Sequence, residues 1–377
     1  MQIAGIVAEY NPFHYGHAHH VAATRRAGAS HIVCVMSGSF VQRGEAAVLN
    51  KWARARTAIA CGADLVMELP LTWSLSPAHR FADGAVFLLD ALGCADTISF
   101  GSECGDIAQI GKAAHGLASN EAQAALHAYI KQGKSYAAAA EEALRTVAPD
   151  CAGVLTSAND TLGVEYLSAL TRLGSNMQPL AIPRVTINSA VPRVARAEIL
   201  REAMRAGENI APLLPEESAA VLREEIAAER VLYSVRTTEK LLLARLCTMR
   251  TEEFALLPEV REGLENRLYR AARGAQTLGE FLDSAKTRRF TRASLRRIAM
   301  DALLGIRAED WHERPPYLHV LAMGKGAPEI LRAARKTARL PIIHTAAQIQ
   351  KLDAAAQNTF ALERRAEELR KLACESF

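Results

Sequence analysis

The pattern of apolar and polar positions divides the chain into a front part with short apolar runs and a rear part with long amphipathic stretches. In the front part, runs of five or six residues that suit buried strands alternate with stretches of helical periodicity. We predict strands at Ile3–Ala8, His31–Met36, Asp64–Leu69 and Asp96–Phe100, and helices at Gly16–Ala27, Asn50–Cys61 and Pro77–Leu92. Strands separated by helices indicate βαβ units and a mostly parallel sheet.

Beyond this region the pattern becomes mostly helical, and from about Ala195 it is also rich in arginine. We predict an alanine-rich helical region at Asp106–Val147 and further helices at Thr161–Leu173 and Ala327–Arg339. Further strands are predicted at Pro179–Ile187, Tyr317–Met323 and Pro341–His344. The predicted fold is therefore an α/β domain with a doubly wound parallel sheet over residues 1–195, followed by a mostly helical, basic domain over residues 196–377.

Charge follows the same division. The first 190 residues carry 13 Lys and Arg against 15 Asp and Glu, and the remainder carry 32 against 26. A near-neutral front and a basic rear suggest a catalytic domain followed by one that faces a polyanion, although a solvated helical surface would give the same balance.

Cysteine usage and hydropathy bear on where the chain works. The seven cysteines are odd in number, widely scattered and without a CxxC pair, which is typical of reduced thiols in the cytosol. No run of about 18 uncharged apolar residues predicts a membrane span. We expect a cytoplasmic protein.

The stretch Glu9–His20 (EYNPFHYGHAHH) carries the clearest chemistry. It follows the first predicted strand and opens the first helix, where free N–H groups and the positive end of the helix dipole favour phosphate. Gly16 removes a side chain where the backbone must approach a nucleotide. His14 and His17 are three residues apart, so both imidazoles can donate hydrogen bonds to a leaving pyrophosphate.

Two other interpretations of these histidines stay open. They could cap and pack the helix without any chemistry. His14, His17 and His20 could also share a face as metal ligands, although no Cys or carboxylate lies at a recognisable ligand spacing, so we predict no metal site.

The residues 11–17 (NPFHYGH) resemble the NPFHxGH signature of the HIGH-type nucleotidyltransferase superfamily. More narrowly, the chain is similar to the bacterial tRNA(Met) cytidine acetate ligase family over roughly residues 1–310, most specifically in the first 105. The other stretches that carry this resemblance are Met36–Glu45, Asn50–Arg54, Gly62–Pro70, Phe100–Glu103, Asn159–Leu167, Ile182–Arg184, Glu262–Arg267 and Lys286–Thr291.

The resemblance implies a reaction and a set of ATP contacts. Acetate would attack the α-phosphate of ATP, which normally arrives with Mg²⁺, and acetyl-adenylate would then acetylate the wobble cytidine of elongator tRNA(Met) to N4-acetylcytidine. By resemblance, ATP would be contacted by Val7, Ala8, Glu9, Tyr10, Asn11, Pro12, Phe13, His14, Tyr15, Gly16, His17, Ala18, His19, His20, Gly101, Asn159 and Arg184.

The residues outside the first loop also have simpler interpretations. Gly101 could only turn the chain, Asn159 could only cap the following helix, and Arg184 could be a surface charge. Lys51 could hold phosphate or RNA or be solvated, and Glu68 could order a cation or accept from a neighbouring backbone group.

The densest basic cluster lies in the rear half. Arg289, Arg292 and Arg296 recur at helical spacing with Phe290 beside them, and arginines with an aromatic side chain suit phosphate and base contacts in RNA. An ordinary charged helix face is the competing interpretation. The predicted RNA-binding residues are Lys286, Arg288, Arg289, Arg292 and Arg296.

One segment departs from the superfamily pattern. The second motif of HIGH-type transferases has serine and threonine where this chain has Arg196 and Glu198, whereas its arginine is matched by Arg201.

Two rival functions remain. The first rival is an adenylyltransferase for a phosphorylated cofactor precursor, which would not need the long basic rear half. The second is a non-catalytic RNA-binding protein, against which the intact His14 and His17 argue.

Overall fold

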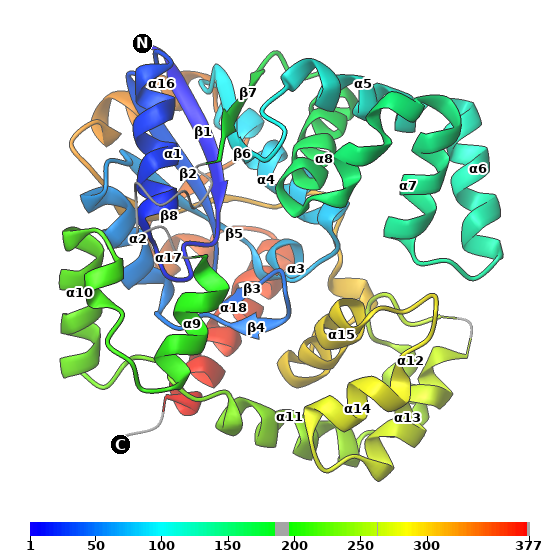
Figure 1. The fold of residues 1–377 in the computed structure, drawn as a ribbon. Helices are drawn as coiled ribbons and strands as arrows, with labels where there is room; N and C mark the ends of the chain where they lie inside the picture. The colour runs from blue at the N-terminus through cyan, green and yellow to red at the C-terminus, as the bar shows by residue number, and fades with distance from the viewer. Residues whose placement is uncertain (185–195, 262, 375–377) are drawn as a thin grey trace.

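The computed structural model describes residues 1–184, 196–261 and 263–374. Its main sheet has seven strands in the order β7-β6-β1-β2-β5-β8-β9 (Figure 1). The strands of this sheet are β1 (Ile3–Ala8), β2 (His31–Ser37), β5 (Leu65–Leu69), β6 (Thr97–Ser102), β7 (Gln178–Pro183), β8 (Leu318–Met323) and β9 (Ile342–Ile343). All neighbours pair in parallel except β5 and β8, so the predicted doubly wound, mostly parallel sheet is confirmed.

Alternating residues of the central strands pack on two helical layers. Val33 and Val35 of β2 join the core beneath α4, whereas Ile32 and Cys34 join the core beneath α1 and α2. Every residue of β2 after His31 is buried, as expected for a strand covered on both faces. The helices of the front part are α1 (Tyr15–Arg26), α2 (Lys51–Ala60), α3 (Leu71–Ser74), α4 (Ala78–Leu92), α5 (Ile107–Ala118), α6 (Asn120–Lys131), α7 (Tyr136–Val147) and α8 (Ala158–Leu173).

Several predicted boundaries change in the structure. The helical region predicted over 106–147 consists of three helices, because Ser119 and Ser135 cap new starts at α6 and α7. The predicted strand over 179–187 ends as β7 at Pro183, and its last three positions lie outside the described residues.

The rear part is mainly helical, as predicted, and two groups of its helices pack on the front part. Leu200 of α9 and Leu222 of α10 bury against Val48 and Leu49. The helices α11 to α15 form a separate apolar core that also takes in Phe40. The bounds are α9 (Ala197–Arg205), α10 (Glu216–Ala227), α11 (Arg236–Thr248), α12 (Thr251–Ala255), α13 (Leu264–Gly274), α14 (Leu278–Ala285), α15 (Arg292–Leu304), α16 (Ala327–Thr337), α17 (Ala346–Ile349) and α18 (Ala354–Ala373).

The end of the chain returns to the front sheet. The strand β8 pairs antiparallel with β5, with Leu65 opposite Met323, and β9 extends the sheet beyond β8. The predicted strand at 317–323 is therefore confirmed, and its pairing shows that the rear half of the chain completes the main sheet. The proposed division into domains 1–195 and 196–377 stays a prediction.

Two further findings concern membrane-spanning helices and the cysteines. None of the described helices is long and apolar enough to cross a membrane. All seven cysteines are free thiols.

Candidate active site

The predicted site lies where the order of the strands reverses. From β1 the chain proceeds outward through β2 and β5 on one side and through β6 and β7 on the other. Ligands of open α/β sheets bind outside the carboxyl ends of the strands at such a switch point. The loop between β1 and α1 and the end of β6 therefore meet at the expected edge (Figure 1).

Two histidines supply the cap of α1. His14 occupies the N-cap position, and its Nδ1 accepts a hydrogen bond from the Gly16 backbone N–H at 3.0 Å. The Nδ1 of His17 accepts from the His14 backbone N–H at 3.2 Å. Because both Nδ1 atoms act as acceptors, a neutral ring carries its proton on Nε2. Capping and phosphate binding are therefore compatible, since each ring keeps one N–H donor.

Burial and nearby cations keep these rings neutral. The imidazoles of His14 and His17 stack with centroids 3.8 Å apart. Burial, followed by the charges of Arg184 and Arg201, lowers the pKa of His14 to about 4. Burial, followed by His14, His20 and Arg184, holds the pKa of His17 well below its usual range. At neutral pH both side chains are therefore dipolar donors without a positive charge.

The side chain of His20 points toward β6 and not toward His14 and His17. The Nε2 of His20 lies 2.9 Å from the hydroxyl of Ser99 on β6. The Nδ1 atoms of His14 and His17 are engaged by the backbone. The three rings therefore do not converge as metal ligands.

The loop after β1 is held by its carbonyl groups. Three alternate carbonyls accept from side chains of other elements: Glu9 from Arg54 at 2.6 Å, Asn11 from Arg201 at 3.0 Å and Phe13 from Ser218 at 2.8 Å. Two of these donors come from α9 and α10, which follow β7 in sequence. The rear half of the chain therefore fixes the shape of the predicted ATP loop.

The three later residues predicted to contact ATP are brought together at the ends of β6 and β7. Gly101 pairs with Ile182, and a Cβ atom at Gly101 would lie 3.5 Å from the Arg184 side chain. Asn159 Nδ2 donates to Glu103 Oε1 at 2.6 Å, and Arg184 Nη1 donates to the same oxygen at 3.1 Å. Glu103, for which no role was apparent from sequence, therefore connects the two polar side chains.

The helix that carries Asn159 has a different cap from the one considered. Ser157 is the N-cap of α8, and its side chain accepts from the Asp160 backbone N–H, so Asn159 lies within the first turn. The carboxylate of Asp160 is buried and accepts from the backbone N–H groups of Glu103 and Cys104 at 3.1 and 3.0 Å. Sequence reasoning missed this residue, because its partners are more than 50 positions away.

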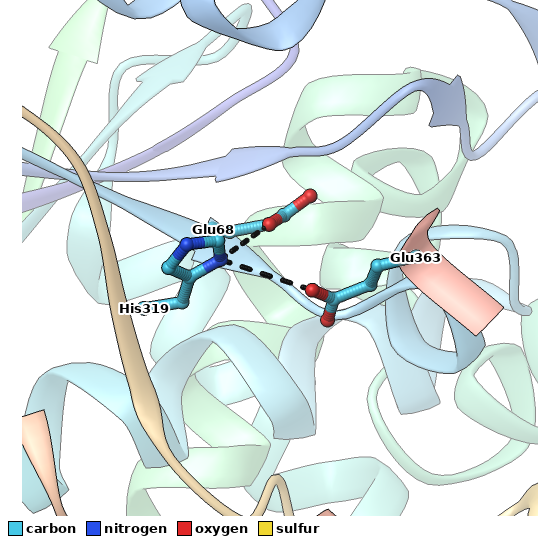
Figure 2. Close-up of side chains that lie close together, drawn as sticks. All are labelled: Glu68, His319 and Glu363. Atoms are coloured by element: carbon cyan, nitrogen blue, oxygen red, sulfur yellow. Dashed lines mark hydrogen bonds and ion pairs between the residues drawn. The ribbon is translucent and has the colours of Figure 1, made fainter. Parts of the chain in front are cut away.

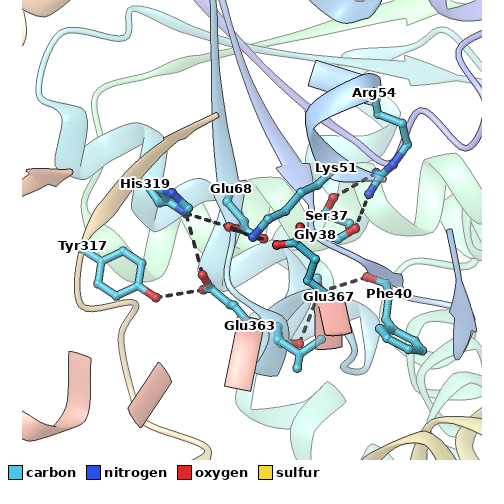
Figure 3. A network of polar contacts seen from close by, with 12 residues as sticks. Ser37, Gly38, Phe40, Lys51, Arg54, Glu68, Tyr317, His319, Glu363 and Glu367 are labelled. Carbon is cyan, nitrogen blue, oxygen red and sulfur yellow. Dashed lines mark hydrogen bonds and ion pairs between the residues drawn. The ribbon is translucent and has the colours of Figure 1, made fainter. Parts of the chain in front are cut away.

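A second polar cluster lies inside the fold. Lys51 is neither a solvated cation nor exposed to phosphate. It is 3 % exposed, and its Nζ donates to both carboxylate oxygens of Glu68 at 2.8 Å. On the other side of Glu68, His319 Nδ1 lies 2.7 Å from Oε2 (Figure 2). Glu363 of α18 stands 3.8 Å from the same ring nitrogen and accepts from the Tyr317 hydroxyl at 2.9 Å (Figure 3).

The charges of this cluster raise the pKa of its histidine, whereas the pKa values of His14 and His17 are lowered. Although burial opposes the change, hydrogen bonds and charge from Glu363 and Glu68 raise the pKa of His319 to about 9. Burial likewise opposes ionisation of Glu68, but Lys51 and His319 outweigh it and lower its pKa to about 2. Two cations therefore face two carboxyl groups.

The same side chains have the spacing of a metal site. Ligand atoms of Glu68, His319 and Glu363 lie within 4.8 Å of one another. However, the Lys51 ammonium already contacts both oxygens of Glu68, and the His319 ring carries a proton where a metal would bind. The donor set is therefore that of a buried ion network that joins α2, β5, β8 and α18.

The predicted RNA-binding residues cluster at the start of α15. Lys286, Arg288 and Arg292 are exposed, and Arg292 also pairs with Asp283. The helix begins at Arg292, so Arg289 precedes it and does not share its periodicity, contrary to the sequence interpretation. The Arg289 guanidinium lies 6.0 Å from the Phe290 ring centroid. Arg296 points toward the front part and pairs with Glu45 at 2.8 Å.

The altered second motif forms the start of α9. Arg196 occupies the N-cap position without a side-chain capping bond, and Glu198 lies 3.5 Å from Arg43. The matched arginine, Arg201, is 8 % exposed and reaches the first loop. The arginine of the motif is therefore retained in the site, whereas a surface ion pair replaces its threonine.

Comparison with known proteins gives full-length matches. The HIGH Nucleotidyl Transferase family model matches residues 1–377, which extends beyond the first 310 residues in which motifs were recognised. The chain is 34% identical over 366 residues to the tRNA(Met) cytidine acetate ligase of Acetivibrio thermocellus, covering 91% of this chain and 88% of that protein. It is 37% identical over 363 residues to the Syntrophotalea carbinolica ligase, covering 93% and 86%.

Solved structures agree with these relatives. Thermotoga maritima TmcAL bound with alpha-thio ATP superimposes with a TM-score of 0.92 at 31% sequence identity, covering 100% of this chain and 95% of that one. The apo form of the same protein gives a TM-score of 0.93. With the motif after β1, the sheet order and the whole length in agreement, the chain belongs to the tRNA(Met) cytidine acetate ligase family of HIGH nucleotidyltransferases.

Proposed function

We propose that this chain is an ATP-dependent ligase that activates acetate as acetyl-adenylate and acetylates the wobble cytidine of elongator tRNA(Met) to N4-acetylcytidine. The observation that carries the proposal is the neutral His14–His17 pair at the start of α1, at the switch point of the sheet. It stands in a chain that matches relatives named tRNA(Met) cytidine acetate ligase over about nine tenths of its length.

ATP would bind across the ends of β1 and β6. The loop 7–20 would surround the phosphates, because its backbone opens a helix N-terminus there. Gly101 leaves room for the nucleoside next to Arg184. Asn159 and Arg184 now share Glu103, and they would exchange that carboxylate for nucleotide oxygens when ATP binds.

In the first step, a carboxylate oxygen of acetate attacks the α-phosphorus of ATP, and the bond to the bridging oxygen of pyrophosphate breaks. Charge grows on the leaving pyrophosphate, where the Nε2–H groups of His14 and His17 would donate hydrogen bonds. Donors that are already oriented by their own Nδ1 contacts need no reorganisation during the step. No covalent intermediate with the enzyme is required.

In the second step, the exocyclic amine of the cytidine attacks the acetyl carbon, AMP leaves with the bonding electrons, and the amine loses a proton to solvent. The tRNA would be held by Lys286, Arg288, Arg289, Arg292 and Arg296 at the start of α15. Lys286 and Arg288 are exposed there, as phosphate contacts require.

Two accompanying proposals follow from the reaction. Mg²⁺ would enter as the counter-ion of ATP, held chiefly by the phosphates and water, with Glu103 as a carboxylate at the same edge. The enzyme would work in the cytoplasm, where tRNA is found, and its seven free thiols suit a reducing compartment.

Mass spectrometry after incubation with ATP, Mg²⁺ and acetate, with and without total tRNA, tests the proposal. We expect acetyl-adenylate or AMP to form, and N4-acetylcytidine to appear in the tRNA sample. Intact ATP in both incubations would instead support a non-catalytic RNA-binding protein. Adenylyl transfer to a phosphorylated cofactor precursor, without tRNA acetylation, would support the other rival.

A further inference from the structure

The two-stranded hairpin of β3 (Phe40–Val41) and β4 (Glu45–Ala46) lies between the first loop and the rear helices. On one side, the backbone N–H of Gln42 donates to the Glu9 carboxylate at 2.9 Å, and the N–H of Val48 donates to the Asn11 side-chain oxygen at 2.8 Å. The hairpin segment is therefore fastened to the predicted ATP loop at two points.

On its other side, the hairpin fits closely against α15. Gly44 has a positive φ of 75°, and a Cβ atom there would lie 2.9 Å from Arg296 Cγ and 3.0 Å from the Arg296 carbonyl carbon. A side chain at this position would collide with the backbone of α15. The tip of the hairpin and the helix are therefore in direct contact.

Glu45 connects both sides through separate carboxylate oxygens. Its Oε1 accepts from Arg296 of α15 at 2.8 Å. Its Oε2 accepts from Arg205 of α9 at 3.5 Å and lies 3.7 Å from the Nε of Arg201. The side chain of Glu45 is 19 % exposed and that of Arg201 is 10 % exposed, so water screens the contact less than at an open surface.

Arg201 continues this connection to the predicted catalytic loop. Its Nη1 donates to the Asn11 carbonyl at 3.0 Å, and its charge contributes to the lowered pKa of His14. The Nε of Arg201 is buried and has no hydrogen-bond partner, so the carboxylate of Glu45 is its electrostatic counterpart. A shift of α15 would therefore reach the loop through Glu45 and Arg201.

We propose that Glu45 is a positioning residue that couples RNA docking at α15 to ATP binding at the loop after β1. RNA that engages the neighbouring arginines would change how Arg296 holds Glu45, and Glu45 would change how Arg201 holds the loop. The inference rests on the proposed function, because it takes α15 as the RNA-binding element. It adds that the two sites are energetically linked through one carboxylate.

Coupling of this kind is measured as a ratio of affinities, and the ratio must be reciprocal. We would measure the dissociation constant of ATP without acetate, with and without saturating tRNA, and that of tRNA with and without ATP. In the wild type we expect each ligand to change the affinity of the other about fivefold or more. In Glu45→Gln and in Arg296→Met the ratio should fall close to one, and the double variant should show no further loss.

The control is Asp83→Asn, which removes the carboxylate of the Arg172–Asp83 pair, also between two helices but away from the hairpin. It should keep the wild-type ratio. An unchanged ratio in Glu45→Gln, or a wild-type ratio of one, would overturn the inference. Thermal unfolding checks each fold, and Arg296→Met provides the same test if Glu45→Gln does not fold. A wild type that makes no acetyl-adenylate would instead refute the proposed function.

Discussion

The protein holds two buried histidine sites whose electrostatics are opposite. At the start of α1, His14 has a pKa lowered to about 4 by burial and by Arg184 and Arg201. Inside the sheet, His319 has a pKa raised to about 9 by Glu363 and Glu68 despite its burial. Burial alone favours the neutral ring in both places, so the sign of the neighbouring charges decides the outcome.

The difference in charge between these histidines suits them to different roles. A neutral histidine with an engaged Nδ1 can donate to a phosphate oxygen and release it again, because it forms no tight ion pair. A charged histidine between two carboxyl groups gives a fixed contact between β8 and α18. We therefore expect changes at the α1 pair to affect the reaction and changes at the ion network to affect stability.

The largest expected effect is in the ion network. Lys51→Met should lower the free energy of unfolding by about 3–5 kcal/mol, because it leaves the buried Glu68 with one cation fewer. Chemical denaturation measures this, and Lys112→Met at an exposed pair should change it by less than about 1 kcal/mol. The double variant Lys51→Met/Glu68→Gln should recover part of the loss. A Lys51→Met protein as stable as the control would show that the network does not support the fold.

The next effect is on the pH dependence of stability, which has opposite signs for His319 and for His20 of α1. The native state binds a proton at His319 between pH 6.5 and about 9, so this contribution is complete below pH 6.5 and is lost as pH rises through 9. The protonated His319 contributes about 3 kcal/mol to the free energy of unfolding. His319→Gln lacks this group, so its stability should fall less than that of the wild type as pH rises through 9. The pKa of His20 is lowered to about 4, so His20→Asn should instead reduce the loss between pH 6.5 and 4. Denaturation curves at several pH values test both, and equal pH profiles for the wild type and His319→Gln would contradict the assignment.

The third effect is on the reaction. His14→Ala and His17→Ala should each slow acetyl-adenylate formation about 100-fold, by loss of one oriented donor to the leaving pyrophosphate. Single-turnover measurements of adenylate formation provide the rate. The exposed His127 on α6 gives the matched control, and His127→Ala should leave the rate unchanged. Wild-type rates in both α1 variants would mean that the pair only caps the helix.

The smallest effect concerns the cation beside the α1 pair. Arg184→Gln should raise the dissociation constant of ATP about tenfold, through loss of a charged hydrogen bond to the nucleotide. It should also raise the pKa of His14 slightly, because the Arg184 charge contributes to lowering it. Calorimetry and an NMR titration measure the two quantities, with Arg172→Gln as the control. A His14 pKa that does not rise would show that the charge of Arg184 does not help to keep the ring neutral.

The local parts of this protein could be read from the sequence. Short apolar runs between helical stretches predicted β1, β2, β5 and β6, because burial on both faces demands continuous apolar strands. The loop after β1 and its histidines were found from a motif of adjacent residues. Even the late return to strand character at Tyr317–Met323 was visible as an apolar run.

Other features depended on contacts between distant positions. The burial of Lys51 required Glu68 and His319, which lie 17 and 268 positions further along the chain. Glu103 became the common partner of Asn159 and Arg184 only when β6, β7 and α8 were brought together. Arg296 resembled a free RNA ligand in sequence, but its partner Glu45 is 251 residues away.

The sequence alone determined the type of sheet and the position of the loop that we propose binds phosphate, because these depend on residues close together in the chain. The tertiary structure decided which charges are paired, which histidines are neutral and how the rear half holds the loop. Electrostatic interactions depend on distance in space and on burial, and neither is set by separation along the chain.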